Sequence, residues 1–177
     1  MKPSYSAVLG CSLTLLAAVL SFSALSAHAK TPQQLSAKID GKLFESDDDG
    51  ILYLIPIKGT MNLIATTKGA SAYPPPKTLS DRLSISCRNF NGKPVKFEAK
   101  DFGSHGCEAR FIKGESKQPM GEPVGEFDAR DGKNVIEITS VNGKVIEGKF
   151  YLELKNKKTK ETIIINEGTF KAEDRQL

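Results

Sequence analysis

Imidazoles, thiols and indoles are scarce in this 177-residue sequence. It contains no tryptophan, two histidines and three cysteines, and aromatic residues make up only 7% of it. His28 lies in an N-terminal segment that we expect to be cleaved, which leaves His105 as the one histidine of the mature chain. No Cys-x-x-Cys pair and no Gly-x-Ser-x-Gly pentapeptide occurs. These absences remove the usual ligand set of a structural zinc site and the nucleophile motif of the α/β-hydrolases.

The charge balance is modest. The chain has 25 basic and 21 acidic residues, and loss of Lys2 with the first 29 residues leaves a positive surplus of three. A surplus of this size does not indicate a nucleic-acid partner. Charged residues make up 26% and hydrophobic residues 39%, which is ordinary for a globular domain and argues against wholesale disorder.

The first 29 residues have the features of a secretory signal peptide. Lys2 provides a positive start, an apolar stretch follows, and Ala27-His28-Ala29 places small residues at the −3 and −1 positions of a signal-peptidase site. We expect residues 1–29 to be removed and residues 30–177 to form one periplasmic or secreted domain. The alternatives are an N-terminal membrane anchor, for which the apolar run is short, and a lipoprotein box ending at Cys11. In the second case Cys11 would precede most of the apolar region instead of following it. We expect no stable membrane anchor after cleavage.

Export would place the two remaining cysteines in an oxidising compartment, where an even pair forms a disulfide by default. Cys87 and Cys107 each fall on the apolar face of an alternating run, 82–88 and 107–111. We therefore predict a Cys87–Cys107 bond, which contributes about 3 kcal/mol in the chain-entropy model. A metal site built on the same thiols lacks partners, since His105 is the one nearby imidazole.

Alternation of apolar and polar residues with a period of two recurs along residues 30–177, whereas no helical period is sustained there. The continuous apolar run Ile51–Ile55, followed by Pro56, predicts a central strand buried on both faces. Tight hairpin turns are expected at the Asx-Gly pairs, which begin at Asp40, Asn91, Asp131 and Asn142. We predict an all-β fold, a single antiparallel β-sandwich or barrel of roughly eight to ten strands.

Two stretches interrupt the strand pattern, Lys68–Asp81 and Lys113–Glu126, and both are long for hairpin loops. Long loops in compact domains are often functional. Each contains or adjoins an apolar side chain that could anchor a partner, and the candidate binding residues are Tyr73, Met120 and Phe127. Tyr73 is followed by three prolines, which favour an extended conformation and suit either a docking peptide or a stiff loop.

A resemblance to a known group of proteins lies in the C-terminal third. Residues 134–150 read Asn-Val-Ile-Glu-Ile-Thr-Ser-Val-Asn-Gly-Lys-Val-Ile-Glu-Gly-Lys-Phe, and residues 163–170 read Ile-Ile-Ile-Asn-Glu-Gly-Thr-Phe. This pattern, I-T-x-x-N-G … I-x-G-x-F followed by N-x-G-T-F, resembles that of small secreted bacterial β-domain proteins of unknown function. Residues 36–44 and 83–92 are similar to the opening and middle strands of that family. The resemblance implies a β fold and export, and it implies no catalytic residues. The chain departs from the pattern at Glu167 and at the cysteine pair.

Three polar clusters carry weaker functional hypotheses. With Glu45 at the first position, Asp47 and Asp49 would fall at positions 3 and 5 of a calcium loop. The twelfth position would then be Pro56, where a glutamate is needed, so we expect a solvated acidic turn and no metal site. Ser104 and His105 are neighbours, whose side chains point apart on an extended chain, which disfavours a nucleophile–base pair. The basic run Lys155–Lys160 is expected at a hairpin tip, with contact to anionic lipid or cell-wall polymer as the alternative.

These observations favour a non-enzymatic binding or interaction module of the cell envelope, with no cofactor. The partner would be an envelope protein or polymer. One alternative is a carrier that holds a small apolar ligand inside a barrel, which requires an enclosed apolar cavity of about 300 Å³ or more. The other is a hydrolase that uses some of the scattered acids, which requires two carboxylates converging in a cleft.

Overall fold

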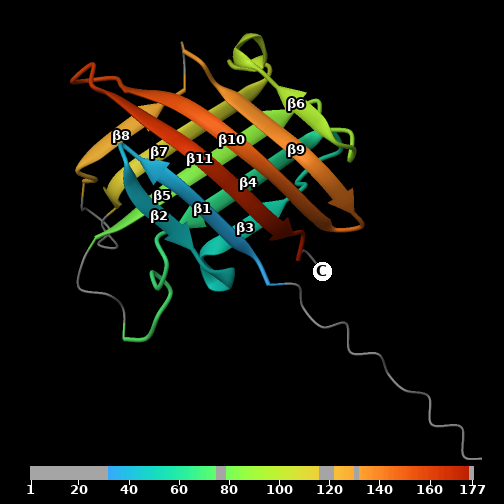
Figure 1. The fold of residues 1–177 in the computed structure, drawn as a ribbon, viewed down its shortest axis with the longest axis horizontal. Helices are drawn as coiled ribbons and strands as arrows, with labels where there is room; N and C mark the ends of the chain where they lie inside the picture. The colour runs from blue at the N-terminus through green and yellow to red at the C-terminus, as the bar shows by residue number, and fades with distance from the viewer. Residues whose placement is uncertain (1–31, 75–78, 116–121, 130–131, 176–177) are drawn as a thin grey trace, which may run out of the picture.

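The structure, a computed structural model, describes residues 32–74, 79–115, 122–129 and 132–175. Within them the chain forms eleven β-strands and two short 3-10 turns, without any α-helix (Figure 1). The strands are β1 (Gln34–Ile39), β2 (Lys42–Ser46), β3 (Ile51–Leu54), β4 (Thr60–Thr66), β5 (Ser80–Arg88), β6 (Val95–Phe97), β7 (Cys107–Glu115), β8 (Gly125–Asp128), β9 (Val135–Asn142), β10 (Val145–Asn156) and β11 (Thr162–Glu173), and the turns are η1 (Asp48–Gly50) and η2 (Ala99–Asp101). The predicted signal peptide and Met120 lie outside the described residues.

The strands form one antiparallel sheet that curls into a nearly closed barrel. Its order is β2-β1-β11-β10-β8-β7-β5-β4-β3, and β9 pairs with the first half of β10 and with β6. A parallel bridge between Tyr53 on β3 and Asp174 after β11 brings the far end of the sheet back toward its beginning. The all-β prediction is confirmed, and the sheet curls far enough to resemble a barrel without pairing β2 with β3.

Side chains fill the interior of the barrel. The inward residues alternate with outward ones along each long strand, and the largest of them are below 2% exposed. They are Tyr53, Leu35, Met61, Leu63, Leu83, Ile85, Ile136, Ile138, Ile146, Leu152, Leu154 and Ile165. This continuous core leaves the polar side chains to the outer wall and to the two ends. No helix of the described residues is long and apolar enough to cross a membrane.

The prediction that Ile51–Ile55 is a central strand buried on both faces is wrong. Strand β3 is the last strand of the sheet order, and Leu52 and Ile55 are 47% and 38% exposed. Ile51 and Tyr53 point into the barrel and Leu52 points out, as the alternation of a strand requires. A continuous apolar run indicates burial on both faces only where a second layer covers the sheet. The outer face of β3 has no such layer.

The residues that carry the family resemblance pack against one another in a reciprocal pair. Gly148 on β10 lies opposite Phe170 on β11, and Phe150 lies opposite Gly168. The two rings are 6.3 Å apart between centroids, and each covers the glycine across from it. A Cβ atom at Gly168 would come within 2.5 Å of the Phe150 ring. The Gly-x-Phe of one strand and the Gly-Thr-Phe of the next therefore form a single packing unit.

Glu167, the departure from the family pattern, is the extra residue of a β-bulge. The β10–β11 register shifts between Phe150 and Leu152, and the β1–β11 register shifts at the same level between Ser36 and Lys38. Glu167 has a φ of 52°, and its carboxylate lies 2.7 Å from the amine of Lys38. A bulge bends the strand that carries it and increases its twist, which helps a sheet to close.

Cys87 and Cys107 form a disulfide between directly opposed positions of β5 and β7, with 4.0 Å between their Cα atoms. Both residues are completely buried, because each sits on the inward face that the alternation predicted. The bond joins two strands that the sheet already pairs, so it fixes their register. It also restricts the conformations that are open to the unfolded chain.

The hairpin turns follow the predicted chemistry in part. Asp40 and Gly41 have φ angles of 47° and 79° in the β1–β2 turn, and Gly143 has a φ of 59° in the β9–β10 turn. The basic run Lys155–Lys160 spans the β10–β11 turn as expected. Asn91-Gly92 is not a hairpin, because it connects β5 to β6, two strands that do not pair with each other. Asp131 lies outside the described residues.

Candidate functional site

An apolar pocket opens at one end of the barrel. It has a volume of about 190 Å³ and lies where the β1–β2 hairpin meets the ends of β4, β5, β7, β8 and β11. Phe44, Phe111, Phe127 and Ile163 form its apolar wall, and each is 5% exposed or less. The Phe44 and Phe111 rings meet edge to face with 6.1 Å between centroids. We call this pocket the mouth.

Charged side chains of both signs surround the mouth. The lining includes three acids and two lysines, which are Asp40, Glu45, Asp81, Lys42 and Lys113. Leu43, between Lys42 and Phe44, also lines it and is 66% exposed. Adjacent residues of a strand point to opposite faces, so Phe44 enters the core while Leu43 stays at the surface. An apolar centre surrounded by polar and charged side chains is the usual composition of a binding surface.

A β-bulge shapes the rim between β5 and β7. The register passes from Ser80 opposite Glu115 to Arg82 opposite Ile112, so one residue, Asp81, faces two. One of those two is Gly114, whose φ of 62° suits glycine. Bulges are frequent at the rims of barrels, where they end regular pairing and redirect side chains.

Two further apolar side chains extend the mouth along this bulge. Leu79 is 52% exposed and Val124 is 70% exposed. Both lie against Gly114, because a Cβ atom there would be 3.4 Å from Leu79 Cδ1 and 2.8 Å from Val124 Cγ2. Leu79 directly precedes β5 and Val124 directly precedes β8, so the ends of the two long loops meet at this point. We call Leu43, Leu79 and Val124 the apolar rim.

The three candidate binding residues predicted from the sequence differ in their exposure and in their position relative to the mouth. Tyr73 is 97% exposed in the β4–β5 loop and does not line the mouth. Phe127 is 3% exposed on β8, so its interpretation as a surface anchor is wrong, although its ring forms part of the pocket wall. It alternates with outward residues and takes the inward position of its strand. Met120 lies outside the described residues.

The apolar rim was not predicted from the sequence. The one local indication was the pair Leu43-Phe44, since two adjacent apolar residues in a strand cannot both enter the core. Leu79 and Val124 are not near each other in the chain. Only the pairing of β5 with β7 and of β7 with β8 brings them together.

The acidic turn acts as a hydrogen-bond acceptor within the fold. Asp47 accepts from the backbone N–H groups of Gly50 and Gly69 at 3.2 and 3.1 Å. Asp48 pairs with the guanidinium of Arg175 at 2.6 and 3.0 Å. The expectation of a merely solvated turn therefore needs correction, because Asp47 joins η1 to the β4–β5 loop at Gly69 and Asp48 joins it to Arg175. In the part of the chain that the structure describes, no group of three His, Cys, Asp or Glu side chains is placed to hold a metal ion.

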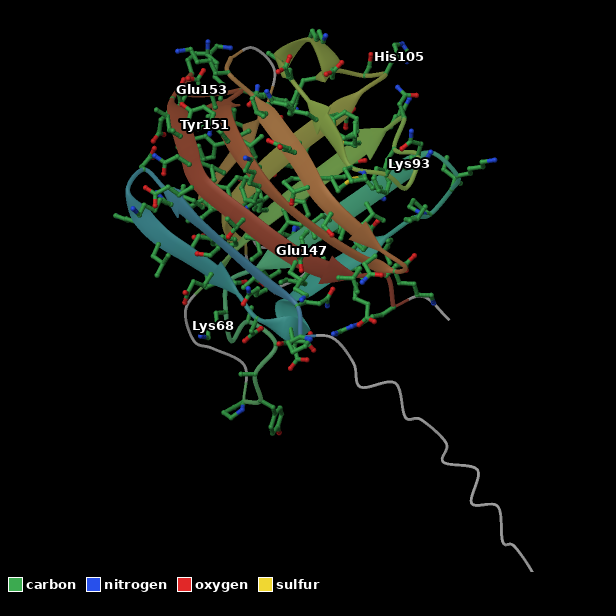
Figure 2. The ribbon with its side chains drawn as sticks, turned by 45° about the vertical axis from the view of Figure 1, so that its right-hand side comes forward. Lys68, Lys93, His105, Glu147, Tyr151 and Glu153 are labelled. Carbon is green, nitrogen blue, oxygen red and sulfur yellow. A yellow bond between two sulfur atoms is a disulfide. The ribbon has the colours of Figure 1, made fainter. Side chains whose placement is uncertain are left out.

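Neither His105 nor the acids of the long strands β9 and β10 line the mouth. Figure 2 shows His105 at the opposite end of the molecule from Lys68, which stands at the foot of the β4–β5 loop. Glu137 and Glu147 form ion pairs with lysines on adjacent strands, at 3.3 and 3.2 Å. Glu153 accepts a hydrogen bond from the backbone at 3.0 Å. These acids are engaged along the wall of the barrel.

Comparisons with known proteins give no relative for this chain. No family model matches it, and neither the curated proteins nor the solved structures include a match. The resemblance to small secreted bacterial β-domain proteins therefore stays a prediction.

Proposed function

We propose that this protein is a non-enzymatic binding module of the cell envelope, which binds a partner protein at the mouth. The mouth takes one apolar side chain of the partner, and the apolar rim of Leu43, Leu79 and Val124 covers the surface around it. Aromatic and aliphatic anchors seated in pockets supply most of the energy of many protein interfaces, and polar residues surround them.

The observation that carries this proposal is the size of the mouth. Pockets that enclose a small-molecule ligand usually have about 300–1,000 Å³. The mouth has about 190 Å³ and ends on the closely packed rings of Phe44, Phe111 and Phe127. A space of this size favours one anchoring side chain over a carried ligand, since side chains already occupy the barrel interior behind it. The acids and lysines around the mouth suit the polar residues that usually surround the apolar centre of a protein interface.

We also propose that the protein is exported to the cell envelope. The predicted signal peptide at residues 1–29, the buried disulfide and the resemblance to secreted β domains all support a periplasmic or secreted location. An enzymatic role has less support. Glu137 and Glu147 are ion-paired along the barrel wall, and the mouth acids Asp40 and Asp81 accept hydrogen bonds from backbone N–H groups.

Site-specific photo-crosslinking in the producing cell tests the proposal. A photoreactive amino acid replaces Leu43 or Val124 in the full-length chain, and Lys149 serves as the matched control. Lys149 is 62% exposed on β10, outside the mouth. We expect both rim positions to give the same discrete protein adduct, with none from Lys149. Leu43→Lys introduced with the probe at Val124 should abolish the adduct, because an ammonium group disfavours an apolar contact.

Two outcomes would overturn the proposal. Equal labelling from Lys149 would show that contact with the rim is not selective. A lipid or other small apolar molecule that co-purifies with the protein, and is displaced by Leu43→Lys, would establish the carrier function instead. Since Leu43 and Val124 are largely exposed, their replacement should change stability by about 0.5 kcal/mol or less. A melting curve of each variant checks that point.

A further inference from the structure

A second hollow lies on the outer wall of the barrel, away from the mouth. It has a volume of about 590 Å³ and is formed by β5, β7 and β8, the turn before β7 and the β10–β11 hairpin. Its described lining contains small and charged residues and no aromatic ring. This volume falls within the range of small-molecule sites. We call it the outer groove.

Positive charge exceeds negative charge among the described lining residues of the outer groove. Arg82, Arg110 and Lys157 line it, together with the two acids Glu108 and Asp128. Asp128 is 13% exposed, and its carboxylate is engaged on both sides. Oδ1 lies 2.8 Å from Arg110 Nε and Oδ2 lies 2.7 Å from Lys157 Nζ. Asp128 thus holds the two cations in place, while their side chains stay about half exposed.

Arg110 retains hydrogen-bonding capacity toward the groove. Its Nε donates to Asp128, and its two Nη groups donate to no other described residue. A guanidinium presents its Nη groups in a plane, which suits the oxygens of a phosphate, sulfate or carboxylate. Because Asp128 fixes the Nε side of that plane, less side-chain entropy is lost when an anion binds.

Serine hydroxyls lie beside Arg110. Ser84 on β5 is directly opposite Arg110 on β7, and Ser86 is opposite Glu108. Both serines line the outer groove, and neither hydroxyl is hydrogen-bonded to a described residue. A hydroxyl both donates and accepts, as the hydroxyls of a sugar do.

We propose that the outer groove binds an acidic saccharide unit, a sugar that bears a phosphate, sulfate or carboxylate. The acidic group lies against Arg110 and Lys157, and the sugar hydroxyls lie over Ser84 and Ser86. The groove is larger than a bare oxyanion requires, and its polar lining gives no reason for an apolar ligand. This site is separate from the mouth, so it adds to the proposed function and does not depend on it.

Calorimetric titration of the mature protein tests the proposal with four probes: glucose 6-phosphate, glucuronate, glucose and inorganic phosphate. We expect the two acidic sugars to bind with millimolar affinity and to exceed both glucose and phosphate. Arg110→Gln should weaken binding of glucose 6-phosphate about tenfold, because one charge-assisted contact is lost. Glu108→Gln should strengthen it, and a gain of binding cannot arise from loss of the fold.

Arg88→Gln is the matched control, since Arg88 is an exposed arginine on the neighbouring strand β5 but does not line the outer groove. It should leave binding unchanged. The proposal is wrong if Arg88→Gln weakens binding as much as Arg110→Gln, because the attraction would then be general charge. It is also wrong if glucose or phosphate binds as tightly as glucose 6-phosphate, or if neither acidic sugar binds at about 10 mM. Leu43→Lys should not affect this titration, which separates it from the test of the mouth.

Discussion

The carboxylate of Asp81 accepts a hydrogen bond from the backbone N–H of Gly114, with 2.8 Å between Oδ1 and N. The backbone of Asp81 also bonds to Thr67, at the end of β4. One residue therefore connects the foot of the β4–β5 loop to the foot of the β7–β8 loop. The apolar rim depends on this connection, because Leu79 and Val124 both rest on Gly114.

Asp81→Ala should loosen the rim. The Gly114 N–H would lose its partner in a part-buried position, and an unsatisfied polar group costs about 1–3 kcal/mol. We expect a corresponding loss in the free energy of unfolding, together with faster hydrogen exchange at the Gly114 amide. Asp81→Asn is the matched control, since its side-chain carbonyl can still accept. Unchanged exchange at Gly114 in the alanine variant would show that this bond does not hold the rim.

Gly168→Ala should destabilise the barrel strongly. The added methyl group would meet the Phe150 ring at 2.5 Å, in a core position where the ring cannot move into solvent. Overpacking of this kind costs about 1–3 kcal/mol. Thr169→Ala, at the exposed neighbouring position, should change the free energy of unfolding by about 0.5 kcal/mol or less. Urea unfolding of both variants measures the difference, and equal midpoints would contradict the packing described for Gly168 and Phe150.

Leu152→Ala and Tyr73→Ala should separate folding from binding. Leu152 is completely buried, and its truncation should cost about 2–5 kcal/mol through the cavity that it leaves. Tyr73 is 97% exposed, so its replacement should barely change the melting temperature. A lower yield of the crosslinked adduct in Tyr73→Ala would add this residue to the interface. A normal yield would show that the loop only connects β4 to β5.

Acid should weaken the Asp128 ion pairs. Burial of the carboxyl group opposes its ionisation, but hydrogen bonds and charges from Lys157 and Arg110 outweigh that effect, so the pKa of Asp128 lies below its ordinary value of 3.8. The pairs therefore stabilise the fold fully above pH 3.8, and this stabilisation is lost as the pH falls through the lowered pKa. Because both cations are about half exposed, each pair contributes about 0.2–1 kcal/mol.

Asp128→Asn isolates this contribution. The wild-type protein should be more stable than the variant at pH 5–7. The difference should shrink below about pH 4, where the wild-type carboxyl group takes up a proton. Urea unfolding at a series of pH values measures it. A difference that stays constant down to about pH 2 would contradict the role assigned to the two cations.

Much of the fold could be predicted because its determinants are local. Alternation placed Leu83, Ile85 and Cys87 on one face of a strand, and the structure buries all three. Asp40-Gly41 marked a turn whose positive φ angles the structure shows. The choice between a sandwich and a barrel could not be made in this way, because it depends on pairings between distant strands, such as β1 with β11.

The candidate site could be predicted only in outline. The two long loops were identified by their interrupted pattern, and their ends do meet at the mouth. Phe127 was predicted to be an exposed anchor because it follows a stretch of glycine and proline. In the structure it is the buried, inward-facing residue of β8. The outer groove gave no linear signal at all. Ser84, Arg110 and Asp128 are far apart in the chain, and only the registers of β5, β7 and β8 align them.

The pairing of β1 with β11 also determines when this chain can complete its fold. Gln34 lies opposite Lys171, so the first strand gains its long partner only after all the strands from β2 to β10 have been synthesised. Contacts of such long sequence separation slow folding, because a large loop must close before they form. Until then β1 and β10 each expose an unpaired edge, the kind of surface that promotes aggregation. The interval before β11 pairs with β1 and β10 is thus the stage of folding at which we expect this barrel to aggregate most readily.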